Sequence, residues 1–458
     1  MSDTSQASVF FQGGTLVLQH LSASEQVPPP FKLIKARWRC EAYHYGSLLP
    51  WLREHGIRND IPRWRHLSLA LYETREPHDY QLAALDAWNQ GGKRGSIILP
   101  TGAGKTFVAI QAISQVNAST VVIVPTLALL HQWYARLVNA FHIDIGVYYS
   151  GEKHILPITV TTYHSAGDLI SEYGNSFQLL LCDELHHLPA KTWGEAALMA
   201  PAPFRLGLTA TYPEEQEQTN GRWRVDELLG PIVYTQRIES LVGKQLAEYR
   251  TQRIRVDLTA EERRHYDADY AIYMGFVRSR QLRQRYGAGW HRELMRLSAS
   301  DPQARQALLA RQRLLDIIWS CEEKFAVLDA LLREHDGERI LVFTASNAVA
   351  YRIAHQWLVP VISFETGVAE RKHILDAFQT GDYRVIVTSR VLNEGVDVPE
   401  AKIAIVLGGG SSQREYIQRL GRILRKHEQR EAFLFEVLVR KTIEEGKVQR
   451  RHVPREQR

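Results

Sequence analysis

A run of apolar residues near position 100 leads into a short loop of small residues and then a lysine. Residues 97–106 read Ile-Ile-Leu-Pro-Thr-Gly-Ala-Gly-Lys-Thr, which predicts a strand, a loop and the start of a helix in that order. Backbone N–H groups at a helix N-terminus bind phosphate oxygens, because the helix dipole favours anions there. The lysine would supply a positive charge to the outer phosphates and the last threonine a hydroxyl to Mg²⁺. The segment therefore predicts a site for a nucleoside triphosphate and Mg²⁺, formed by Thr101, Gly102, Ala103, Gly104, Lys105 and Thr106.

Two adjacent carboxylates follow a second apolar run. Residues 179–182 are Leu-Leu-Leu-Cys, and Asp183 and Glu184 come next. Ligands of open α/β sheets bind at the carboxyl ends of the strands, so both side chains are expected at such an end. We expect Asp183 to hold Mg²⁺ and Glu184 to orient and deprotonate an attacking water. His186 and His187 are expected to have a coupling or hydrogen-bonding role rather than to bind a metal.

A basic segment near the C-terminus has helical spacing. Residues 418–425 read Gln-Arg-Leu-Gly-Arg-Ile-Leu-Arg, so Arg422 and Arg425 share one helix face. Two arginines on one face either form a solvated basic surface or neutralise the charge that develops during phosphoryl transfer.

Strand-like apolar runs that alternate with helical patterns position these residues. Runs of this kind indicate parallel sheets covered on both faces, so the sequence predicts an α/β protein with two parallel-sheet lobes. The end of one run, Thr209-Ala210-Thr211, carries hydroxyls that are expected to hydrogen-bond the acidic pair. The strands are expected at 96–99, 121–124, 158–161, 179–182 and 206–209 in the first lobe and at 339–343, 385–387 and 403–407 in the second.

Two segments lie outside these series. Residues 9–72 predict a small α/β accessory domain, whose aromatic residues, interleaved with arginines, form either its core or a surface for base stacking. Residues 260–317 lack strand signals and predict a helical insertion at the start of the second lobe. The insertion's excess of arginines indicates either a solvated helix surface or phosphate contacts. These arginines are Arg278, Arg280, Arg283, Arg285, Arg292, Arg296, Arg305, Arg311 and Arg313.

Length and composition set the remaining limits. A chain of 458 residues is too long for one core and suggests about three domains. Its three cysteines lie far apart and suggest neither a disulfide framework nor a zinc site. A net charge of +5 permits a nucleic-acid partner without requiring one. The sequence shows no signal peptide and no membrane span, so a cytoplasmic protein without membrane association is expected.

Taken in order, the motifs resemble those of a superfamily 2 helicase, and more closely those of the XPB family in its archaeal and bacterial form. The resemblance covers nearly the whole chain. Leu99 stands where the strict phosphate-loop pattern has its first glycine, a variant common in helicase-like motors. The segments that carry the resemblance are Tyr80-Gln81, 99–106, Pro125-Thr126, Gln132-Trp133, 161–163, 183–187, 204–211, Phe343-Thr344, Thr388, 394–397 and 414–425.

The resemblance implies a domain order and a set of site residues. A domain similar to a damage-recognition domain would occupy 1–74, a RecA-like lobe 75–245, and a second RecA-like lobe 246–458 with a thumb-like insertion near 260–317. ATP would bind between the lobes, with Gln81 reading adenine. The catalytic residues would be Lys105, Asp183, Glu184, Gln418, Arg422 and Arg425, with further nucleotide contacts from Gly395 and Asp397. DNA would bind Pro125, Thr126, Thr162, Tyr163 and Thr388.

The implied function is that of an ATP-dependent 3′-to-5′ DNA helicase or duplex translocase in DNA repair. Two alternatives are an ATP-switched DNA clamp that recruits a partner nuclease and the motor subunit of a restriction-type system. The sequence departs from the family at His78, where an arginine is frequent, and at 214–216. Glu-Glu-Gln there replaces the family's Arg-Glu-Asp, so weak strand separation is expected.

Overall fold

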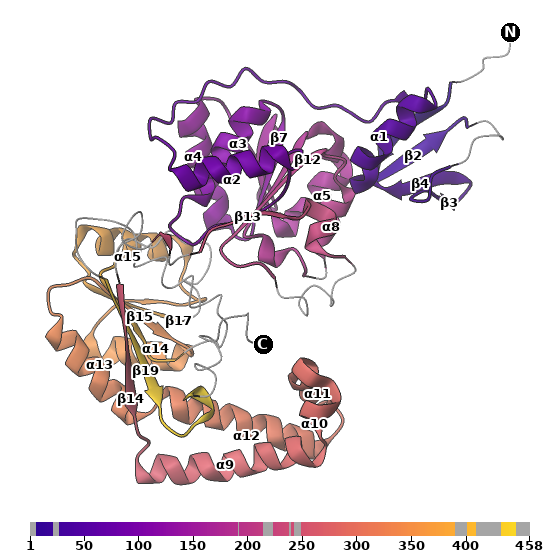
Figure 1. Ribbon diagram of the computed structural model, residues 1–458. Coiled ribbons are helices and arrows are strands. Elements are labelled where there is room, and N and C mark those ends of the chain that lie inside the picture. The colour runs from indigo at the N-terminus through magenta and orange to yellow at the C-terminus, as the bar shows by residue number, and fades with distance from the viewer. Residues whose placement is uncertain are drawn as a thin grey trace. The chain divides into compact units, whose positions relative to one another are not determined.

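The computed structural model describes residues 6–21, 27–190, 192–213, 223–237, 240–241, 249–389, 401–408 and 432–445, apart from the side chains of Ala288 and Val368. The chain divides into two compact units, Met1–Leu241 and Val242–Arg458, each of which is described by itself. Figure 1 shows the elements of both units. In the described ranges no helix is both long and apolar enough to cross a bilayer. The domain boundary predicted at 245 falls among residues that are not described, so it stays a prediction.

The first unit begins with a small mixed sheet of strand order β3-β4-β2-β1-β5. Leu16, Leu18 and Tyr45 are buried in its core, and Trp38, Trp51 and Trp64 pack against that core. These aromatic side chains therefore help to form the interior of the accessory domain. The elements are β1 (Ser8–Gln12), β2 (Thr15–Gln19), β3 (Lys32–Ile34), β4 (Arg37–Glu41), η1 (Ala42–His44), α1 (Tyr45–Glu54) and β5 (Arg58–Asn59).

The segment after β5 fastens this small sheet to the rest of the unit. Asn175 donates a side-chain hydrogen bond to the carbonyl of Ile61 at 3.0 Å. The backbone N–H of Leu67 donates to the carbonyl of Asn117 at 2.9 Å. Further along, the Tyr72 ring stacks on His142 with the ring centroids 4.1 Å apart.

The main sheet of the first unit has the order β13-β6-β12-β11-β7-β10-β8-β9, and all its neighbouring strands except β8 and β9 are parallel. The five strands predicted for this lobe are β6, β7, β10, β11 and β12. The bounds are β6 (Arg94–Ile98), β7 (Thr120–Val124), β8 (Gly146–Tyr149), β9 (Glu152–His154), β10 (Ile158–Thr162), β11 (Leu179–Asp183), β12 (Phe204–Thr209) and β13 (Ile232–Thr235).

Helices cover both faces of this sheet, α2, α3 and α4 on one face and α5 and α8 on the other (Figure 1). Their apolar sides are buried, as in α3, where seven of twelve residues are buried. The bounds are α2 (Asp79–Gln90), α3 (Lys105–Val116), α4 (Leu127–Phe141), α5 (Tyr163–Tyr173), η2 (Gly174–Ser176), η3 (Leu185–His187), α6 (Gly194–Met199) and α8 (Val225–Leu229).

The second unit holds a sheet of order β14-β19-β18-β15-β17-β16, in which every pair of neighbouring strands is parallel. Together with the first sheet it confirms the predicted α/β class. The bounds are β14 (Tyr249–Val256), β15 (Ile340–Thr344), β16 (Val361–Ile362), β17 (Val385–Ser389), β18 (Ile403–Val406), β19 (Ala432–Val439), α13 (Glu322–Glu334), α14 (Asn347–Trp357) and α15 (Val368–Thr380).

The predicted helical insertion is present between β14 and α13. It consists of α9 (Ala260–Ser279), α10 (Leu282–Tyr286), η5 (Gly287–Gly289), α11 (Trp290–Leu297) and α12 (Pro302–Trp319). The long helices α9 and α12 pack side by side, and α10 and α11 lie at their far end (Figure 1). Thr259 caps α9 by accepting from the N–H of Glu262, and Asp301 caps α12 ahead of Pro302.

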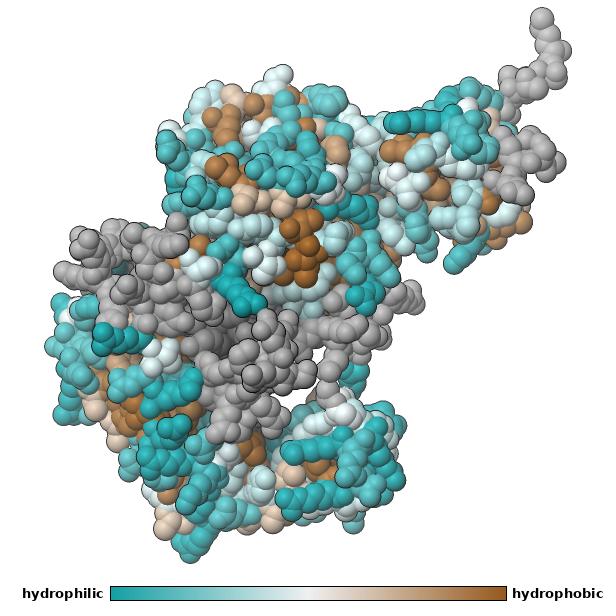
Figure 2. Space-filling model, viewed as in Figure 1, coloured by the Kyte–Doolittle hydropathy of each residue, from teal (hydrophilic) through white to brown (hydrophobic). Residues whose placement is uncertain are grey.

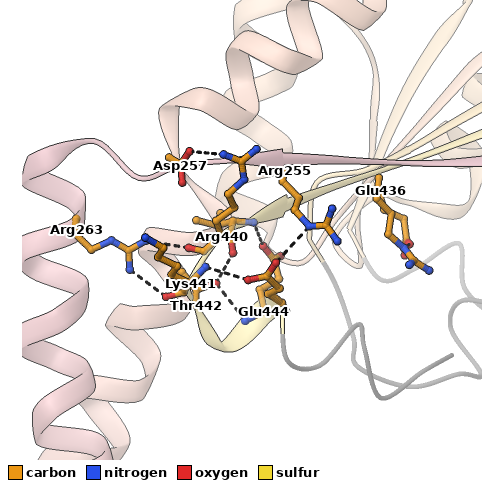
Figure 3. Close-up of polar contacts among 11 residues, drawn as sticks. Arg255, Asp257, Arg263, Glu436, Arg440, Lys441, Thr442 and Glu444 are labelled. Carbon is orange, nitrogen blue, oxygen red and sulfur yellow. Dashed lines mark hydrogen bonds and ion pairs between the residues drawn. The ribbon is translucent and has the colours of Figure 1, made fainter. Parts of the chain in front are cut away.

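A polar network ties the base of the insertion to the second sheet (Figure 3). Arg263 of α9 donates to the carbonyls of Arg440 and Lys441, which follow β19, at 2.9 and 3.1 Å. Glu444 accepts from the N–H of Val439 and from the buried Nζ of Lys324 on α13, each at 2.9 Å. The turn after β19 therefore connects both α9 and α13 to the carboxyl end of that strand.

Candidate functional site

Five neighbouring parallel strands of the first unit end at one edge of the sheet, and each delivers a predicted site segment there. The phosphate loop follows β6, Thr209 ends β12, Asp183 ends β11, Thr126 follows β7 and Thr162 ends β10. In the sheet order these strands stand side by side as β6-β12-β11-β7-β10. The carboxyl edge of a parallel sheet is where such folds bind ligands, so this edge is the candidate site.

The loop between β6 and α3 has the backbone that a phosphate site needs. Gly102 and Gly104 have φ of +86° and +78°, a left-handed conformation that side chains disfavour. A Cβ atom on Gly104 would also lie 2.5 Å from Nε2 of Gln81. The backbone conformation therefore favours glycine at position 104, and a side chain there would also displace the Gln81 amide.

Two residues of α2 hold this loop in place. The Tyr80 hydroxyl and the Gln81 amide nitrogen donate to the carbonyl of Ala103 at 2.8 and 3.0 Å. Oε1 of Gln81 accepts from the N–H of His78 at 3.0 Å. A glutamine amide has a second N–H and a second lone pair, so Gln81 retains the capacity to bind adenine. Its adenine contact stays a prediction.

Lys105 and Glu184 face one another across the site. Lys105 Nζ lies 3.8 Å from Glu184 Oε1, and their side chains are only 10% and 14% exposed. Two buried oxygens nearby, Glu184 Oε2 and Thr101 Oγ1, have no hydrogen-bond partner among the described residues. A lysine, a carboxylate and unsatisfied oxygens at the start of a helix fit a nucleotide phosphate with its Mg²⁺ and an attacking water.

The backbone separates the two adjacent carboxylates. Glu184 has φ of +48°, a conformation uncommon for residues other than glycine, so the chain turns sharply directly after β11. Asp183 consequently remains buried at the strand end, while Glu184 lies beside Lys105.

Hydrogen bonds hold Asp183 on several sides. Its Oδ1 accepts from the N–H of Glu184 at 2.9 Å and its Oδ2 from the indole of Trp133 at 2.8 Å. Tyr163 donates its hydroxyl to the backbone carbonyl of Asp183 at 3.0 Å. Burial and the neighbouring Glu184 raise the pKa of Asp183 to about 6, although Lys105 and the hydrogen bonds from Trp133 and the Glu184 N–H oppose the shift.

Trp133 was not among the residues predicted for the site. Its side chain is 1% exposed, as expected for an aromatic core residue. The helix that carries it begins after Thr126, and Trp133 lies about two turns further on. That spacing, together with the place of Gln132-Trp133 among the segments that resemble the helicase family, could have pointed to a role near the strand ends.

The expected contact between Thr209 and the acidic pair is indirect. Oγ1 of Thr209 lies 3.0 Å from Nδ1 of His186, and the same ring nitrogen lies 3.4 Å from Glu184 Oε2. His186 therefore stands between the hydroxyl and the carboxylate, because the turn at Glu184 brings η3 over the end of β12. The hydrogen-bonding role predicted for His186 is confirmed.

The residues predicted to bind DNA differ in exposure. Pro125 and Thr126 are half-buried, and Thr126 caps α4 by accepting from the N–H of Leu129 at 3.3 Å. Thr162 and Tyr163 are buried, and the Tyr163 hydroxyl is used by Asp183. In the second unit Thr388 is buried, and its hydroxyl has no partner among the described residues. The DNA contacts of all five remain predictions.

Several predicted residues lie outside the described ranges. They include residues 214–216, where the sequence departs from the family pattern, and the remaining residues predicted for the ATP site. The roles of all these residues stay predictions from the sequence. The ATP-site residues concerned are Gly395, Asp397, Gln418, Arg422 and Arg425.

Five of the nine arginines between residues 278 and 313 of the insertion fall into two groups. Arg280, Arg296 and Arg313 form ion pairs with Asp301, Glu293 and Asp269. Arg278 and Arg285 are exposed and form no ion pair with any described residue. Figure 2 shows that the surface at the end of the insertion is mainly hydrophilic. The first group therefore stabilises the helices, and the second is available to phosphates.

Comparison with known proteins assigns the family. Residues 74–214 match the model of the res subunit of type III restriction enzymes, and residues 323–427 match the helicase conserved C-terminal domain. A protein of Sulfurisphaera tokodaii named DNA 3′-5′ translocase XPB2 is 43% identical over 80% of this chain and 82% of its own length.

Two more distant matches agree with it. The Mycobacterium tuberculosis protein named DNA 3′-5′ helicase XPB is 29% identical over 76% of this chain and 57% of its own length. The crystal structure of the Hef helicase domain from Pyrococcus furiosus shares the fold, with a TM-score of 0.50 and 17% identity over 81% of this chain and 97% of that one. The phosphate loop, the acidic strand end and the 43% identity together place the chain in the XPB family of superfamily 2 helicases.

Proposed function

We propose that the protein is an ATP-driven motor that moves on DNA in the 3′-to-5′ direction and works in DNA repair. The observation that carries the proposal is the carboxyl edge of the first sheet, where Lys105 and Glu184 face each other beside the buried Asp183. The relative that is 43% identical bears the name of a 3′-5′ translocase. The cytoplasmic location expected from the sequence stays part of this proposal.

The residues at the carboxyl edge of the first sheet have different roles in ATP hydrolysis. Lys105 and the N–H groups of the loop bind the outer phosphates, and Gln81 contacts adenine beside the loop that it already supports. Glu184 takes a proton from the attacking water, and His186 Nδ1 lies 3.4 Å from its carboxylate. Thr106 and Asp183 would hold Mg²⁺, which when bound neutralises charge on the phosphates. Gln418, Arg422 and Arg425 are proposed to stabilise the transition state.

DNA is proposed to run along the ends of β7 and β10. Small hydroxyl residues at strand ends suit phosphate oxygens, and Pro125, Thr126 and Thr162 stand at these ends. Thr388 would contribute from the second unit. The exposed arginines of the insertion supply positive charge for further phosphate contacts.

The test is the ATPase rate of the purified protein on single-stranded, duplex and forked DNA, measured side by side. We expect DNA to raise the turnover number for ATP by about tenfold or more, because bound DNA is expected to complete the arrangement of the active site. An ATPase rate that none of the three kinds of DNA changes would refute the proposed motor function. Displacement of a protein roadblock by ATP hydrolysis then separates a motor from an ATP-switched clamp that recruits a nuclease, because a clamp does not advance.

Strand separation is proposed to be weak when the protein acts alone. Glu214, Glu215 and Gln216 stand where the family has Arg-Glu-Asp. The arginine is missing, so the segment carries more negative charge, which repels the phosphates of an opening duplex. The change Glu214→Arg should raise unwinding per ATP and leave the ATP affinity as it is. Vigorous unwinding of a tailed duplex by the unmodified protein would show that the missing element is not needed.

A further inference from the structure

Two buried aromatic side chains, from two different helices, donate hydrogen bonds to the same residue. Trp133 of α4 donates to the Asp183 carboxylate at 2.8 Å, and Tyr163 of α5 donates to the Asp183 carbonyl at 3.0 Å. They are 1% and 2% exposed. The Tyr163 ring also stacks on Trp193, with the centroids 5.2 Å apart. Close packing restricts the movement of either ring relative to the helix that carries it.

Both helices begin at a segment that we propose binds DNA. Thr126 caps the start of α4, and Thr162 is the residue before α5. Thr162 and Val124 are direct partners in the ladder of β10 and β7, so the two helix starts lie at adjacent strand ends. Each path from a proposed DNA contact to Asp183 therefore consists of one short piece of helix and one hydrogen bond.

We propose that Trp133 and Tyr163 are positioning residues through which bound DNA sets the orientation of Asp183 and so accelerates ATP hydrolysis. DNA at the start of α4 or α5 favours one placement of that helix, and the bonded ring transmits this placement to Asp183. Trp133 acts on the carboxylate and Tyr163 on the backbone at the end of β11. The inference rests on the proposed function, since it concerns the DNA-stimulated part of the ATPase.

The change Trp133→Phe removes the indole N–H and keeps an aromatic ring in the core. At saturating DNA we expect kcat to fall by about fivefold or more, while KM for ATP changes by less than about twofold. The DNA-free rate should fall by a smaller factor, so the ratio of the two rates decreases. A purely structural role would lower both rates together and leave this ratio unchanged.

Trp88→Phe is the matched control. Trp88 is also fully buried in the first unit, and its indole donates to the carbonyl of Arg205 at 2.9 Å. The control loses the same kind of hydrogen bond at a place that does not touch Asp183. We expect its stimulation by DNA to equal that of the unmodified protein.

Tyr163→Phe provides an independent test, because it removes one oxygen and leaves the stacked ring in place. Stimulation by DNA should fall again, whereas Tyr45→Phe, which removes a buried hydroxyl bonded to Asn59, should not change it. If both residues act on Asp183, the double variant should lose less stimulation than the product of the two single losses. Thermal melting of every variant identifies any that fail to fold.

The outcomes separate the inference from the function on which it rests. If DNA does not change the ATPase rate of the unmodified protein, the proposed function is refuted. A stimulated unmodified protein together with equally stimulated Trp133→Phe and Tyr163→Phe variants overturns the inference alone. If Trp133→Phe does not fold, the result for Tyr163→Phe decides the question.

Discussion

Thr209 Oγ1 and His186 Nδ1 lie 3.0 Å apart, at the ends of two elements that meet beside Glu184. The same imidazole nitrogen is 3.4 Å from Glu184, so the hydroxyl holds the ring that faces the proposed base. Thr209→Val keeps the side-chain shape and removes the hydroxyl. We expect kcat for ATP to fall by about tenfold with little change in KM. Thr209→Ser restores the hydroxyl and should recover most of the rate; equal losses in the two variants would contradict this role.

Lys105 and Glu184 have separable tasks, although they lie 3.8 Å apart. Lys105→Ala should lose nucleotide binding and turnover together. Glu184→Gln keeps the side-chain size, so it should bind ATP and lose turnover by about 100-fold or more. A fluorescent ATP analogue measures binding, and phosphate release measures turnover. Undiminished hydrolysis by Glu184→Gln would show that another group activates the water.

The ionisation of Asp183 should make stability depend on pH. Its pKa in the folded protein is about 6, because burial and Glu184 disfavour the charge, and this lies above the ordinary value of 3.8. The folded state therefore binds the proton more tightly, and the resulting stability is present near pH 4 and lost as the pH rises through 6.

Asp183→Asn does not ionise and should avoid this loss. Without nucleotide and Mg²⁺, its free energy of unfolding should exceed that of the unmodified protein by about 1 to 3 kcal/mol at pH 7. The difference should shrink towards pH 4. Urea titrations at pH 4, 5, 6 and 7 measure it, and a difference that does not grow with pH would contradict the assignment.

Arg205 should be a large contributor to the stability of the first unit. Its guanidinium is fully buried and donates to the carbonyls of Ala197, Ala200, Ala202 and Leu228. Arg205→Met removes a donor from four carbonyls, of which only that of Leu228 keeps a hydrogen bond from another arginine, and should cost about 2 to 4 kcal/mol. Arg94→Met is the control, since half-buried Arg94 donates to the same Leu228 carbonyl and should cost less than about 1 kcal/mol. Equal losses in urea denaturation would rule out the special role of burial.

The exposed arginines of the insertion should contribute to DNA affinity through charge alone. Arg278→Gln with Arg285→Gln should weaken binding to all sequences and flatten the salt dependence by about one unit of slope per lost phosphate contact. The control is Glu293→Gln with Arg296→Gln, which removes an ion pair and keeps the net charge. An unchanged salt slope in the first variant would indicate a merely solvated surface.

The sequence predicted those strands and loops whose structure follows from the local pattern of residues. Buried parallel strands such as β11 are continuous apolar runs, and the phosphate loop needs glycine and lysine at fixed positions. β14 was missed because it carries Arg250, Arg253 and Arg255 and is the edge strand of its sheet. Its apolar residues alternate with charged ones, and its partner β19 lies 183 residues further along the chain.

The site was predictable to the same extent. The types and order of Lys105, Asp183 and Glu184 indicated their chemistry, but their contacts depend on backbone geometry that no local pattern encodes. The left-handed turn at Glu184 decides that Thr209 meets His186 rather than a carboxylate. The contact of Trp133 with Asp183 joins residues 50 positions apart, and a buried tryptophan in a helix is usually read as core.

The position of β19 bears on how the chain folds while it is being made. This strand lies between β14 and β18 in the second sheet, although it is the last strand described in the chain. All strands of the first sheet precede residue 241, so that unit can finish its sheet early in translation. During synthesis on the ribosome, β14 cannot pair with β19 until residues 432–439 have emerged. Until then, β18 also lacks its β19 partner and has one unpaired edge. Open strand edges attract other chains, so we expect the nascent second unit to be exposed to aggregation for longer than the first.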